Sequence, residues 1–484
     1  MRSKSIIILF VLVMVLALTG CLKSASSTQA LPNTGTAVPT GAGTTAQGQQ
    51  VIAVPTVVST PTASGAVTST PVASTPAAAS TNPNAIKVGL VYPMGGPLAN
   101  WGKDAQPFID AAQTSINSSP AAVSAGKQFN FVVQSDDQTQ ANTLAAVKEL
   151  VEKEKVSVIV GLPTSQELGY VMPYLAQHHI LVISSAPVDS TTSLQKADLL
   201  YRLEPGDLYQ AQILGQFAIQ QGYTKALIVY RNDSWGSSYA NTVATQFKNK
   251  KYKAVLFSVK PSIGTNISDY GNDVKSLASK AIKLGVDKNL VVILALKEGE
   301  DLDIMHYGAQ DSTLASIRWL SATLYPSLLT GTFGANLNVP DARDFALARN
   351  LWGSEPYITV NDTVTNIFNQ ASTSLGHAPE MDHFYLYDAM QLAAQAILQA
   401  KSNKVTAIVK AFPTVVKNYQ GITGVIQFDK YGDRDVSDLG YFGLYKDSTK
   451  TGDAAWSFSY YAVYDSASKT FKVLSTPAPR LGSY

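Results

Sequence analysis

The sequence predicts an α/β fold built from two parallel-sheet lobes that are joined by a hinge. From residue 86 onward, short apolar segments alternate with segments whose apolar residues recur at helical spacing. The alternation restarts after Arg202, which gives two series in one chain. Because parallel strands need a crossover connection, each series predicts a parallel sheet covered by helices on both faces. The folded part spans roughly 390 residues, which favours two domains over one core.

The first series lies between residues 86 and 183. We expect strands at residues 86–92, 129–133, 156–160 and 180–183, and helices at residues 104–117, 143–154 and 165–177. This series has too few strands to stand alone, so a later helix at residues 384–401 is expected to complete the first lobe.

The second series starts with a helix at residues 208–221. Expected strands follow at residues 226–230, 254–259, 290–296 and 317–320, with helices at residues 238–249 and 270–284. The apolar segments 442–445 and 458–464 are expected to return to this second lobe. The chain then crosses between lobes near Pro205, Pro356 and Asp429, and a cleft between lobes is where ligands bind.

These crossings predict how the chain is divided. The first lobe combines residues 86–205 with 357–429, and the second combines 206–356 with 430–476. Residues 477–484 are expected to form a C-terminal tail.

The N-terminus predicts export and a lipid anchor. Arg2 and Lys4 precede an apolar run at residues 6–18, which is too short for a comfortable membrane span. The run ends in Leu-Thr-Gly-Cys at Cys21, which is typical of a lipoprotein signal peptide. We therefore expect cleavage after residues 1–20, acylation of Cys21 and attachment to the cell membrane. The alternative is an ordinary secreted protein with one stray cysteine.

A stalk is predicted between this anchor and the folded part, at residues 21–85. Residues 24–86 contain no charged side chain and are rich in Thr, Ser, Pro and Ala, so they cannot bury enough apolar surface to fold. We expect these residues to form either a plain spacer or a spacer that carries O-linked sugars. Loss of residues 1–20 leaves 35 basic against 35 acidic residues, and this balance argues against nucleic acid as a partner.

Polar and aromatic residues follow the predicted strands, where ligands of open α/β sheets bind. Backbone N–H groups at helix starts there suit an anion or a carbonyl group. The candidate ligand-binding residues are Trp101, Thr164, Ser165, Ser185, Ala186, Pro187, Trp235, Lys297 and Thr323.

Each candidate also has a structural alternative. Thr164 and Ser165 suit a helix cap, Trp101 suits plain packing, and Lys297 suits a solvated surface. Asp136, with the residue after it, fits a turn or cap better than a ligand contact.

At these positions the sequence resembles the branched-chain amino-acid (leucine/isoleucine/valine) binding proteins of ABC transporters. The resemblance covers residues 86–464 and is carried by seven motifs in order. They are Ile-Lys-Val-Gly (86–89) with Gly-Pro-Leu-Ala-Asn-Trp-Gly (96–102), Asp-Asp-Gln (136–138), Val-Gly (160–161) with Thr-Ser (164–165), residues 180–185, Asp-Ser-Trp-Gly (233–236), Tyr-Asp-Ala opening a helix (387–389), and Gly-Val-Ile-Gln-Phe-Asp (424–429) with Gly-Asp (432–433). The resemblance implies the type I periplasmic-binding-protein fold, with two Rossmann-like lobes and a three-strand hinge.

The resemblance also implies roles for single residues. It places the carboxylate-holding serine at Ser165 and the aromatic walls at Trp101 and Trp235. Val188 stands where the family has a threonine, and Thr323 stands near its ammonium-binding acid. A tyrosine of the family falls near Leu296 or Lys297. The ammonium-binding set is therefore incomplete, and a carboxylate, an amide or a urea-like solute fits at least as well as an amino acid.

The predicted function is capture of a small polar ligand and its delivery to an ABC permease, by a monomer without cofactor or metal. The alternative is a receptor of the same fold that senses a ligand and acts on a membrane or cell-wall partner. Catalysis is disfavoured, because the sequence has neither a Gly-x-Ser-x-Gly nor a His-Glu-x-x-His motif. The five histidines, among them His383, are not at a familiar metal-ligand spacing.

Overall fold

The computed structural model describes residues 82–479, apart from 97–98, 187–198, 262–269, 298, 325–327, 329–331, 334–336 and 339. The predicted signal peptide, Cys21, most of the stalk, Pro187 and Val188 lie outside the described residues. Within the described part of the chain, no helix has both the length and the apolar character needed to cross a membrane.

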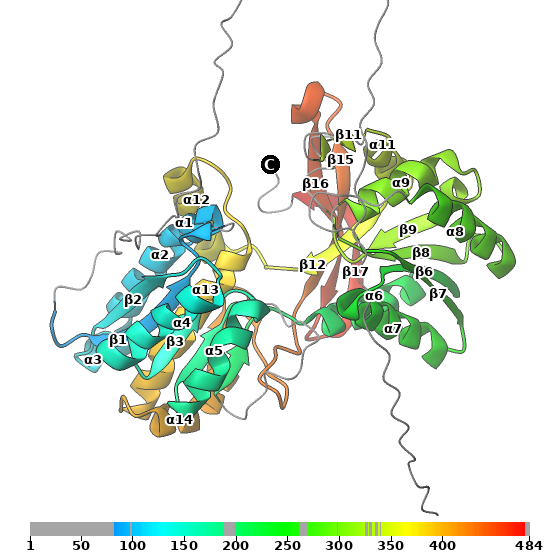
Figure 1. Ribbon diagram of the computed structural model, residues 1–484. Coiled ribbons are helices and arrows are strands. Elements are labelled where there is room, and N and C mark those ends of the chain that lie inside the picture. Colours follow the sequence, from blue (N-terminus) through cyan, green and yellow to red (C-terminus); the bar gives the residue numbers. More distant parts are fainter. Residues whose placement is uncertain are drawn as a thin grey trace, which may run out of the picture. The chain divides into compact units, whose positions relative to one another are not determined.

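The first sheet has five parallel strands in the order β2-β1-β3-β4-β5 (Figure 1). They are β1 (Ile86–Tyr92), β2 (Phe129–Ser135), β3 (Val158–Gly161), β4 (Leu181–Ser184) and β5 (Leu200–Arg202). All four pairings are parallel, and Ile86 lies opposite Phe129 where β1 and β2 begin. Strand β5 is absent from the prediction, because three residues are too few to give a periodic signal.

Both faces of this sheet are covered by helices. Alternate residues of β3 point to opposite faces, so Val160 packs with α2 (Gln106–Ser118) and α13 (Asp382–Ala400). Ile159 packs on the other face with α4 (Gln140–Lys148) and α5 (Ser165–Gln177). The other helical segments on this lobe are α1 (Ala99–Asp104), α3 (Pro120–Ser124), α12 (Asp362–Leu375), α14 (Val405–Asn418) and a π-helical turn at Glu149–Lys153.

The second sheet has eight strands in the order β17-β16-β15-β12-β9-β8-β6-β7. Parallel pairing joins β6 (Lys225–Arg231), β7 (Lys253–Val259), β8 (Leu290–Ala295), β9 (Arg318–Ser321) and β12 (Trp352–Pro356). Antiparallel pairing then adds β15 (Leu439–Lys446), β16 (Trp456–Asp465) and β17 (Thr470–Pro479). The two mainly parallel sheets confirm the predicted fold class.

Helices also cover both faces of the second sheet (Figure 1). Ile228 of β6 packs with α6 (Asp207–Gln220) and α7 (Ser234–Asn249). Val229, the next residue, packs on the opposite face with α8 (Gly271–Leu284), α9 (Glu300–Gln310) and α11 (Pro340–Ala348). The remaining elements are a 3-10 turn at Leu314–Ser316, another at Gly452–Ala455, and the short pairs β10 (Thr332–Phe333) with β11 (Leu337–Asn338) and β13 (Gln420–Gly421) with β14 (Gly424–Val425).

Two differences from the prediction concern the C-terminal part. The segment Tyr-Asp-Ala at 387–389 does not open a helix, because α13 begins at Asp382 and Asp388 lies buried within it. Asp388 instead accepts hydrogen bonds from the Ile422 and Thr423 N–H groups and so holds the β13–β14 pair against the helix. Strand β17 extends to Pro479, so the boundary predicted after residue 476 falls inside a strand.

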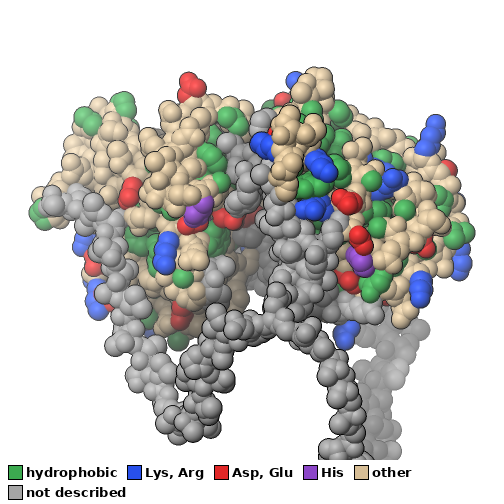
Figure 2. Space-filling model, turned by 90° about the horizontal axis from the view of Figure 1, so that it is seen from above, with side chains coloured by type: hydrophobic (Ala, Val, Ile, Leu, Met, Phe, Trp, Pro, Cys, Tyr) green, Lys and Arg blue, Asp and Glu red, His purple; other side chains and the backbone are tan. Residues whose placement is uncertain are grey.

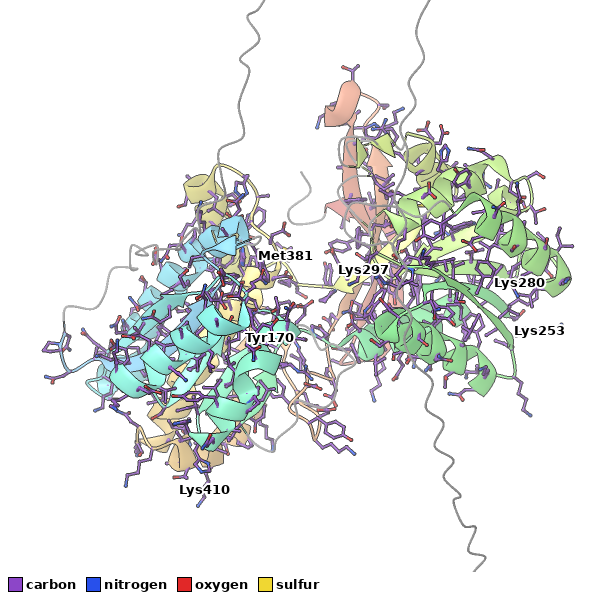
Figure 3. All side chains as sticks on the ribbon, in the orientation of Figure 1. Tyr170, Lys253, Lys280, Lys297, Met381 and Lys410 are labelled. Carbon is purple, nitrogen blue, oxygen red and sulfur yellow. The ribbon has the colours of Figure 1, made fainter. Side chains whose placement is uncertain are left out.

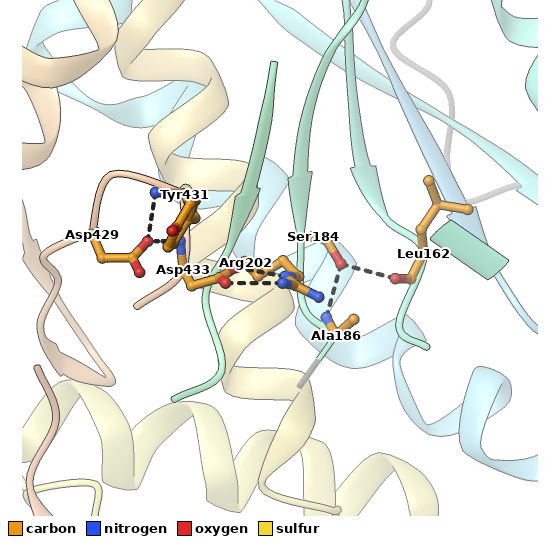
Figure 4. A network of polar contacts seen from close by, with 7 residues as sticks. All are labelled: Leu162, Ser184, Ala186, Arg202, Asp429, Tyr431 and Asp433. Atoms are coloured by element: carbon orange, nitrogen blue, oxygen red, sulfur yellow. Dashed lines mark hydrogen bonds and ion pairs between the residues drawn. The ribbon is translucent and has the colours of Figure 1, made fainter. Parts of the chain in front are cut away.

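Two of the segments that cross between the sheets are bonded to each other. Arg202, the last residue of β5, donates its N–H to Gly432 O at 2.8 Å and accepts from the Arg434 N–H at 3.2 Å. The Arg202 guanidinium binds Asp433 through two contacts, Nε to Oδ1 at 2.6 Å and Nη2 to Oδ2 at 2.9 Å (Figure 4). Gly432 has a φ of +79°, and a Cβ there would lie 2.1 Å from Leu200 O, so only glycine fits.

Candidate functional site

A pocket of about 260 Å³ lies where the crossing segments meet both sheets. Its floor and walls come from the first crossing, from the N-terminus of α13, from α7 and from the ends of β9 and β12. The lining residues are Glu204, Asp207, Gln210, Trp235, Tyr239, Ala322, Thr323, Ser354, Glu355, Pro356, Glu380, Met381, Asp382 and Tyr385. The pocket therefore draws on segments that are up to 181 positions apart in the sequence, from Glu204 to Tyr385.

Five of these lining residues carry carboxylates, and none of the lining residues that the structure describes is Lys, Arg or His. Asp207 is the first residue of α6 and Asp382 the first of α13, so the positive end of a helix dipole stabilises each carboxylate. Glu204 lies in the loop before α6. Burial and the nearby charges of Asp382 and Asp207 raise the pKa of Glu204 well above its usual value.

Aromatic side chains form the remaining walls. Trp235 and Tyr239 lie one helical turn apart on α7, with ring centroids 5.6 Å apart. Tyr239 is 2% exposed, and the Ser354 hydroxyl lies next to its hydroxyl as a hydrogen-bonding neighbour. Tyr385 is buried on α13, with the Arg434 guanidinium carbon 5.9 Å from its ring centroid.

Arg434 lies beside the Tyr385 ring, and its guanidinium is hydrogen-bonded within the protein. The guanidinium is fully buried and donates to Leu203 O, Thr423 O and Val425 O. Arg202 is likewise occupied by Asp433. Arg202 and Arg434 are therefore both engaged in structural contacts.

A second polar group lies at the carboxyl ends of the first sheet's strands. The Tyr92 hydroxyl lies 3.2 Å from His383 Nδ1, and the Trp101 ring lies 5.5 Å from the Tyr92 ring and 5.9 Å from the imidazole. Burial lowers the pKa of His383 to about 3, so the imidazole is neutral. The Ser185 hydroxyl also lies close enough to act on the pKa of Tyr92.

A buried pair of carboxyl groups, Asp136 and Glu167, lies behind this group. The Thr143 hydroxyl donates to Asp136 Oδ2 at 2.8 Å, while Glu167 Oε2 accepts from the Thr164 N–H at 2.8 Å. Burial and the charge of Asp136 raise the pKa of Glu167 to about 8. Asp136 Oδ1 and Glu167 Oε1 are buried without a separate donor among the described residues, which is how two carboxyl groups share one proton.

The structure brings two of the predicted ligand-binding residues into the pocket, Trp235 and Thr323. Lys297, at the end of β8 (Figure 3), lies beside this group, with its Nζ 5.9 Å from the Trp235 ring centroid. Met381, which lines the pocket, is labelled at the N-terminus of α13 in the same figure. Trp235 and Thr323 thus remain candidates that the geometry places together.

The predicted residues of the first lobe lie outside this lining. Thr164 caps α5 in a capping box with Glu167, which confirms the cap as one of its roles. Ser165 is the first residue of α5 and is half-buried. Ala186 is fully buried and donates its N–H to Ser184 Oγ at 2.9 Å (Figure 4). Trp101 and Ser185 lie with Tyr92, and Pro187 is outside the described residues.

The sequence interpretation missed the carboxylates of the pocket lining. It considered only the family's ammonium-binding positions, where Thr323 stands near the family's acid. The structure supplies acids from other segments, namely Glu204, Asp207, Glu355, Glu380 and Asp382. The sequence did contain a signal for two of these acids. Glu204 immediately precedes Pro205 and Glu355 immediately precedes Pro356, where the chain was predicted to cross between the lobes.

No group of three or more His, Cys, Asp or Glu residues that could hold a metal ion occurs in the described ranges. Glu204, Asp207 and Asp382 nevertheless lie close enough for their charges to act on one another. On the face drawn in Figure 2, basic and acidic side chains are interspersed, and neither sign forms a continuous patch.

Comparisons with known proteins agree with this architecture. Residues 85–448 match a family described as "Periplasmic binding protein". An uncharacterized protein of Methanocaldococcus jannaschii is 21% identical over 388 residues, covering 76% of this chain and 88% of that protein.

Two solved structures illustrate the similarity in fold. A branched-chain amino-acid ABC transporter periplasmic ligand-binding protein from Burkholderia xenovorans has a TM-score of 0.60 at 13% identity, covering 82% of this chain and 96% of its own. An ABC transporter solute-binding protein from Rhodopseudomonas palustris, in complex with 3,4-dihydroxybenzoic acid, has a TM-score of 0.56 at 17% identity. The match covers 79% of this chain and 98% of that one.

Proposed function

The chain belongs to the periplasmic binding protein family, a family of binding proteins and not of enzymes, and from this premise we propose that it captures a small polar solute outside the cytoplasm. The candidate ligands are an amino acid, a carboxylate or an amide-type solute. An ABC importer in the membrane receives the solute, and a lipid on Cys21 keeps the protein at the cell membrane.

One observation carries this proposal: a single pocket is lined by segments of both sheets. Asp382 and Tyr385 come from α13 on the first sheet, whereas Trp235 and Thr323 come from the second. A solute that contacts both sets favours the arrangement in which the two sheets approach it together, by its differential affinity for that arrangement. Such a change in arrangement is a signal that a permease can detect.

Similar proteins support this assignment of ligand size and class. The Rhodopseudomonas palustris protein was solved with an aromatic acid, and the Burkholderia xenovorans protein is described as a branched-chain amino-acid carrier. Both ligand types are small, and the pocket volume of about 260 Å³ suits solutes of that size.

A thermal-shift screen of the purified full chain against amino acids, carboxylates, amides and urea-like compounds tests the proposal. A ligand present at 100 times its Kd stabilises the native state by about 2.7 kcal/mol, which is a measurable rise in Tm. We expect at least one hit, followed by a Kd from calorimetry. The proposal fails if no small solute in the panel raises Tm.

Truncation of an aromatic side chain in the pocket wall tests whether the ligand found in the screen binds in this pocket. We expect Trp235→Ala to weaken binding at least tenfold, because a buried aromatic anchor contributes about 2 kcal/mol or more. Tyr252→Ala is the matched control, since Tyr252 is an exposed aromatic outside the pocket lining and its loss should leave the Kd unchanged. Equal Kd values for the wild type and Trp235→Ala would place the ligand elsewhere.

A further inference from the structure

A groove of about 1450 Å³ lies at the amino ends of the first sheet's strands. Ile86, the first residue of β1, lines it together with Lys127 and Ser157, which lie just before β2 and β3. The other walls are α3, the second half of α13 and the end of α14, and Figure 1 shows α3 and α14 at one end of this lobe. The solute pocket is lined instead by residues that follow strands, such as Glu204 after β5, so the groove lies at the opposite edge of the sheet.

The lining of this groove is basic. It contains neither Asp nor Glu, and four of its residues are exposed lysines, namely Lys127, Lys155, Lys401 and Lys404. No ion pair between described residues engages any of these four lysines. Their positive charges therefore face the groove without a carboxylate in its lining.

The glutamates that precede Lys155 are bound to other groups. Glu154 pairs with Lys87 at 2.7 Å, and Glu149 pairs with Lys153 at 2.7 Å. Glu152 Oε1 accepts a hydrogen bond from the Tyr174 hydroxyl at 2.9 Å. Because the acids of this segment have partners outside the groove, the groove lysines are left to attract an anion from outside the chain.

Apolar side chains accompany the lysines. Five residues of the lining are aliphatic, namely Ile86, Ile116, Ile397, Leu398 and Val415. On α3, Ala121 and Ala125 also line the groove, and Val123 between them is 64% exposed. Cations that border exposed apolar groups match the boundary between lipid headgroups and acyl chains, where both kinds of contact are available.

The N-terminal extension of the chain supplies no anion to this groove. Residues 24–86 contain no charged side chain, so the predicted stalk cannot neutralise the lysines. The extension joins the folded part at Ile86, which itself lines the groove. The groove therefore lies where the chain from the predicted anchor enters the lobe, and the membrane is the anionic surface to which that chain leads.

We propose that the groove is a docking surface for the anionic phosphate headgroups of the membrane that carries the predicted lipid anchor. The lysines bind headgroup phosphates, and the aliphatic groups of α3 contact the boundary of the acyl chains. Each lysine held near an anionic membrane surface adds to the attraction, which falls off within a Debye length. This inference goes beyond solute capture and rests on the membrane attachment that is part of the proposed function.

Cosedimentation with lipid vesicles tests the docking surface. The protein is the chain from residue 22 onward, which lacks the predicted signal peptide and lipid and keeps every described residue. The vesicles contain equal parts of phosphatidylglycerol and phosphatidylcholine, or phosphatidylcholine alone. We expect binding to the anionic vesicles to be roughly tenfold tighter or more, and to weaken with added NaCl. Equal binding to both kinds of vesicle, or binding to neither, overturns the inference.

Glycine variants assign the binding to the groove without disturbing the fold. Lys155 and Lys401 have φ values of +57° and +50°, a left-handed conformation that glycine adopts more readily than lysine. Lys155→Gly and Lys401→Gly should each weaken binding to the anionic vesicles about fivefold, because each removes one lysine near the surface. Lys251→Gly is the matched control, since Lys251 is exposed, has a φ of +61° and lies between α7 and β7, outside the groove lining. Equal losses in the three variants overturn the groove as the docking surface.

Inorganic phosphate distinguishes a membrane from a small soluble anion. We expect calorimetry of the same chain with inorganic phosphate to show no saturable binding. Saturable binding that both groove variants weaken would overturn the membrane as the occupant in favour of a free anion. None of these measurements includes a transported solute, so their failure leaves solute capture standing. A failed solute screen overturns solute capture and not the docking surface.

Discussion

At the scale of single residues, the buried carboxyl groups of Asp136 and Glu167 stand out in the first lobe, because burial raises the pKa of both. Glu167 closes the capping box of α5 through the Thr164 N–H, so its position is fixed by local helix chemistry. The same position places its carboxyl group beside Asp136 at the end of β2. The pair must therefore hold a proton that an isolated carboxylate would have lost at neutral pH.

This pair predicts a stability that depends on pH. The native pKa of Glu167 is raised from 4.5 to about 8, so its stabilising contribution is complete below pH 4.5 and is lost as pH rises towards 8. Glu167→Gln mimics the protonated form, and we expect it to be more stable than the wild type by about 1–2 kcal/mol at pH 8. At pH 4.5 the two should have equal stability.

Thermal unfolding of both proteins between pH 4.5 and pH 8.5 measures this difference. The control is Glu152→Gln, which changes an exposed glutamate of the same region. A Glu167→Gln curve parallel to that of the wild type at every pH would show that Glu167 is ionised in the native state.

At the scale of secondary-structure elements, the paired crossing segments are the feature that connects the two sheets. Arg202 and the stretch from Gly432 to Arg434 are joined by backbone bonds in both directions and by the buried Arg202–Asp433 ion pair. Two hydrogen-bonded segments resist twisting more than one free segment does. The sheets are therefore expected to move by bending this pair as a unit.

Loss of one partner of this ion pair should destabilise the fold. We expect Asp433→Asn to lower the free energy of unfolding by about 3 kcal/mol, because it leaves the fully buried Arg202 guanidinium without its counter-charge. Chemical denaturation measures the change. Lys87→Met is the control, since the Lys87–Glu154 pair is partly exposed and should contribute about 1 kcal/mol or less. Similar losses in both variants would contradict a special role for the buried pair.

Prediction of helices and strands succeeded where the pattern of apolar residues was strong. It failed for a strand that forms because it pairs with distant parts of the chain. The apolar strands β1, β6 and β8 are evident in the sequence because both of their faces are buried. Strand β12 (Trp-Gly-Ser-Glu-Pro) carries no such pattern and forms because it pairs with β9 and β15. The amphipathic helices α12 and α14 were also missed, although their apolar spacing was present in the sequence.

At the scale of the whole molecule, the fold could be predicted but most of the site could not. Alternating strands and helices specify two sheets whatever their exact boundaries. The pocket instead depends on which loops meet, and acids such as Glu204 and Asp382 are 178 positions apart in the sequence. No local pattern joins them, so only Trp235 and Thr323 among the predicted residues line the pocket.

The predicted lipid anchor leads to an expectation about the whole chain. Cys21→Ala removes the only thiol in the sequence, so we expect the protein to leave the membrane fraction and appear in the soluble fraction. Cell fractionation with immunodetection measures this change, and Ser24→Ala serves as the control that stays with the membrane. Retention of Cys21→Ala in the membrane fraction would argue against acylation at this position.

The β17 edge of the second sheet affects how copies of this protein can associate at high concentration. Strand β17 forms that edge and ends in Thr-Pro-Ala-Pro, so Pro477 and Pro479 have no N–H group to offer to another chain. An exposed strand edge is a template for aggregation, and proline is one of the residues that block it. When copies of this protein reach a high local concentration, this edge limits their growth into shared sheets.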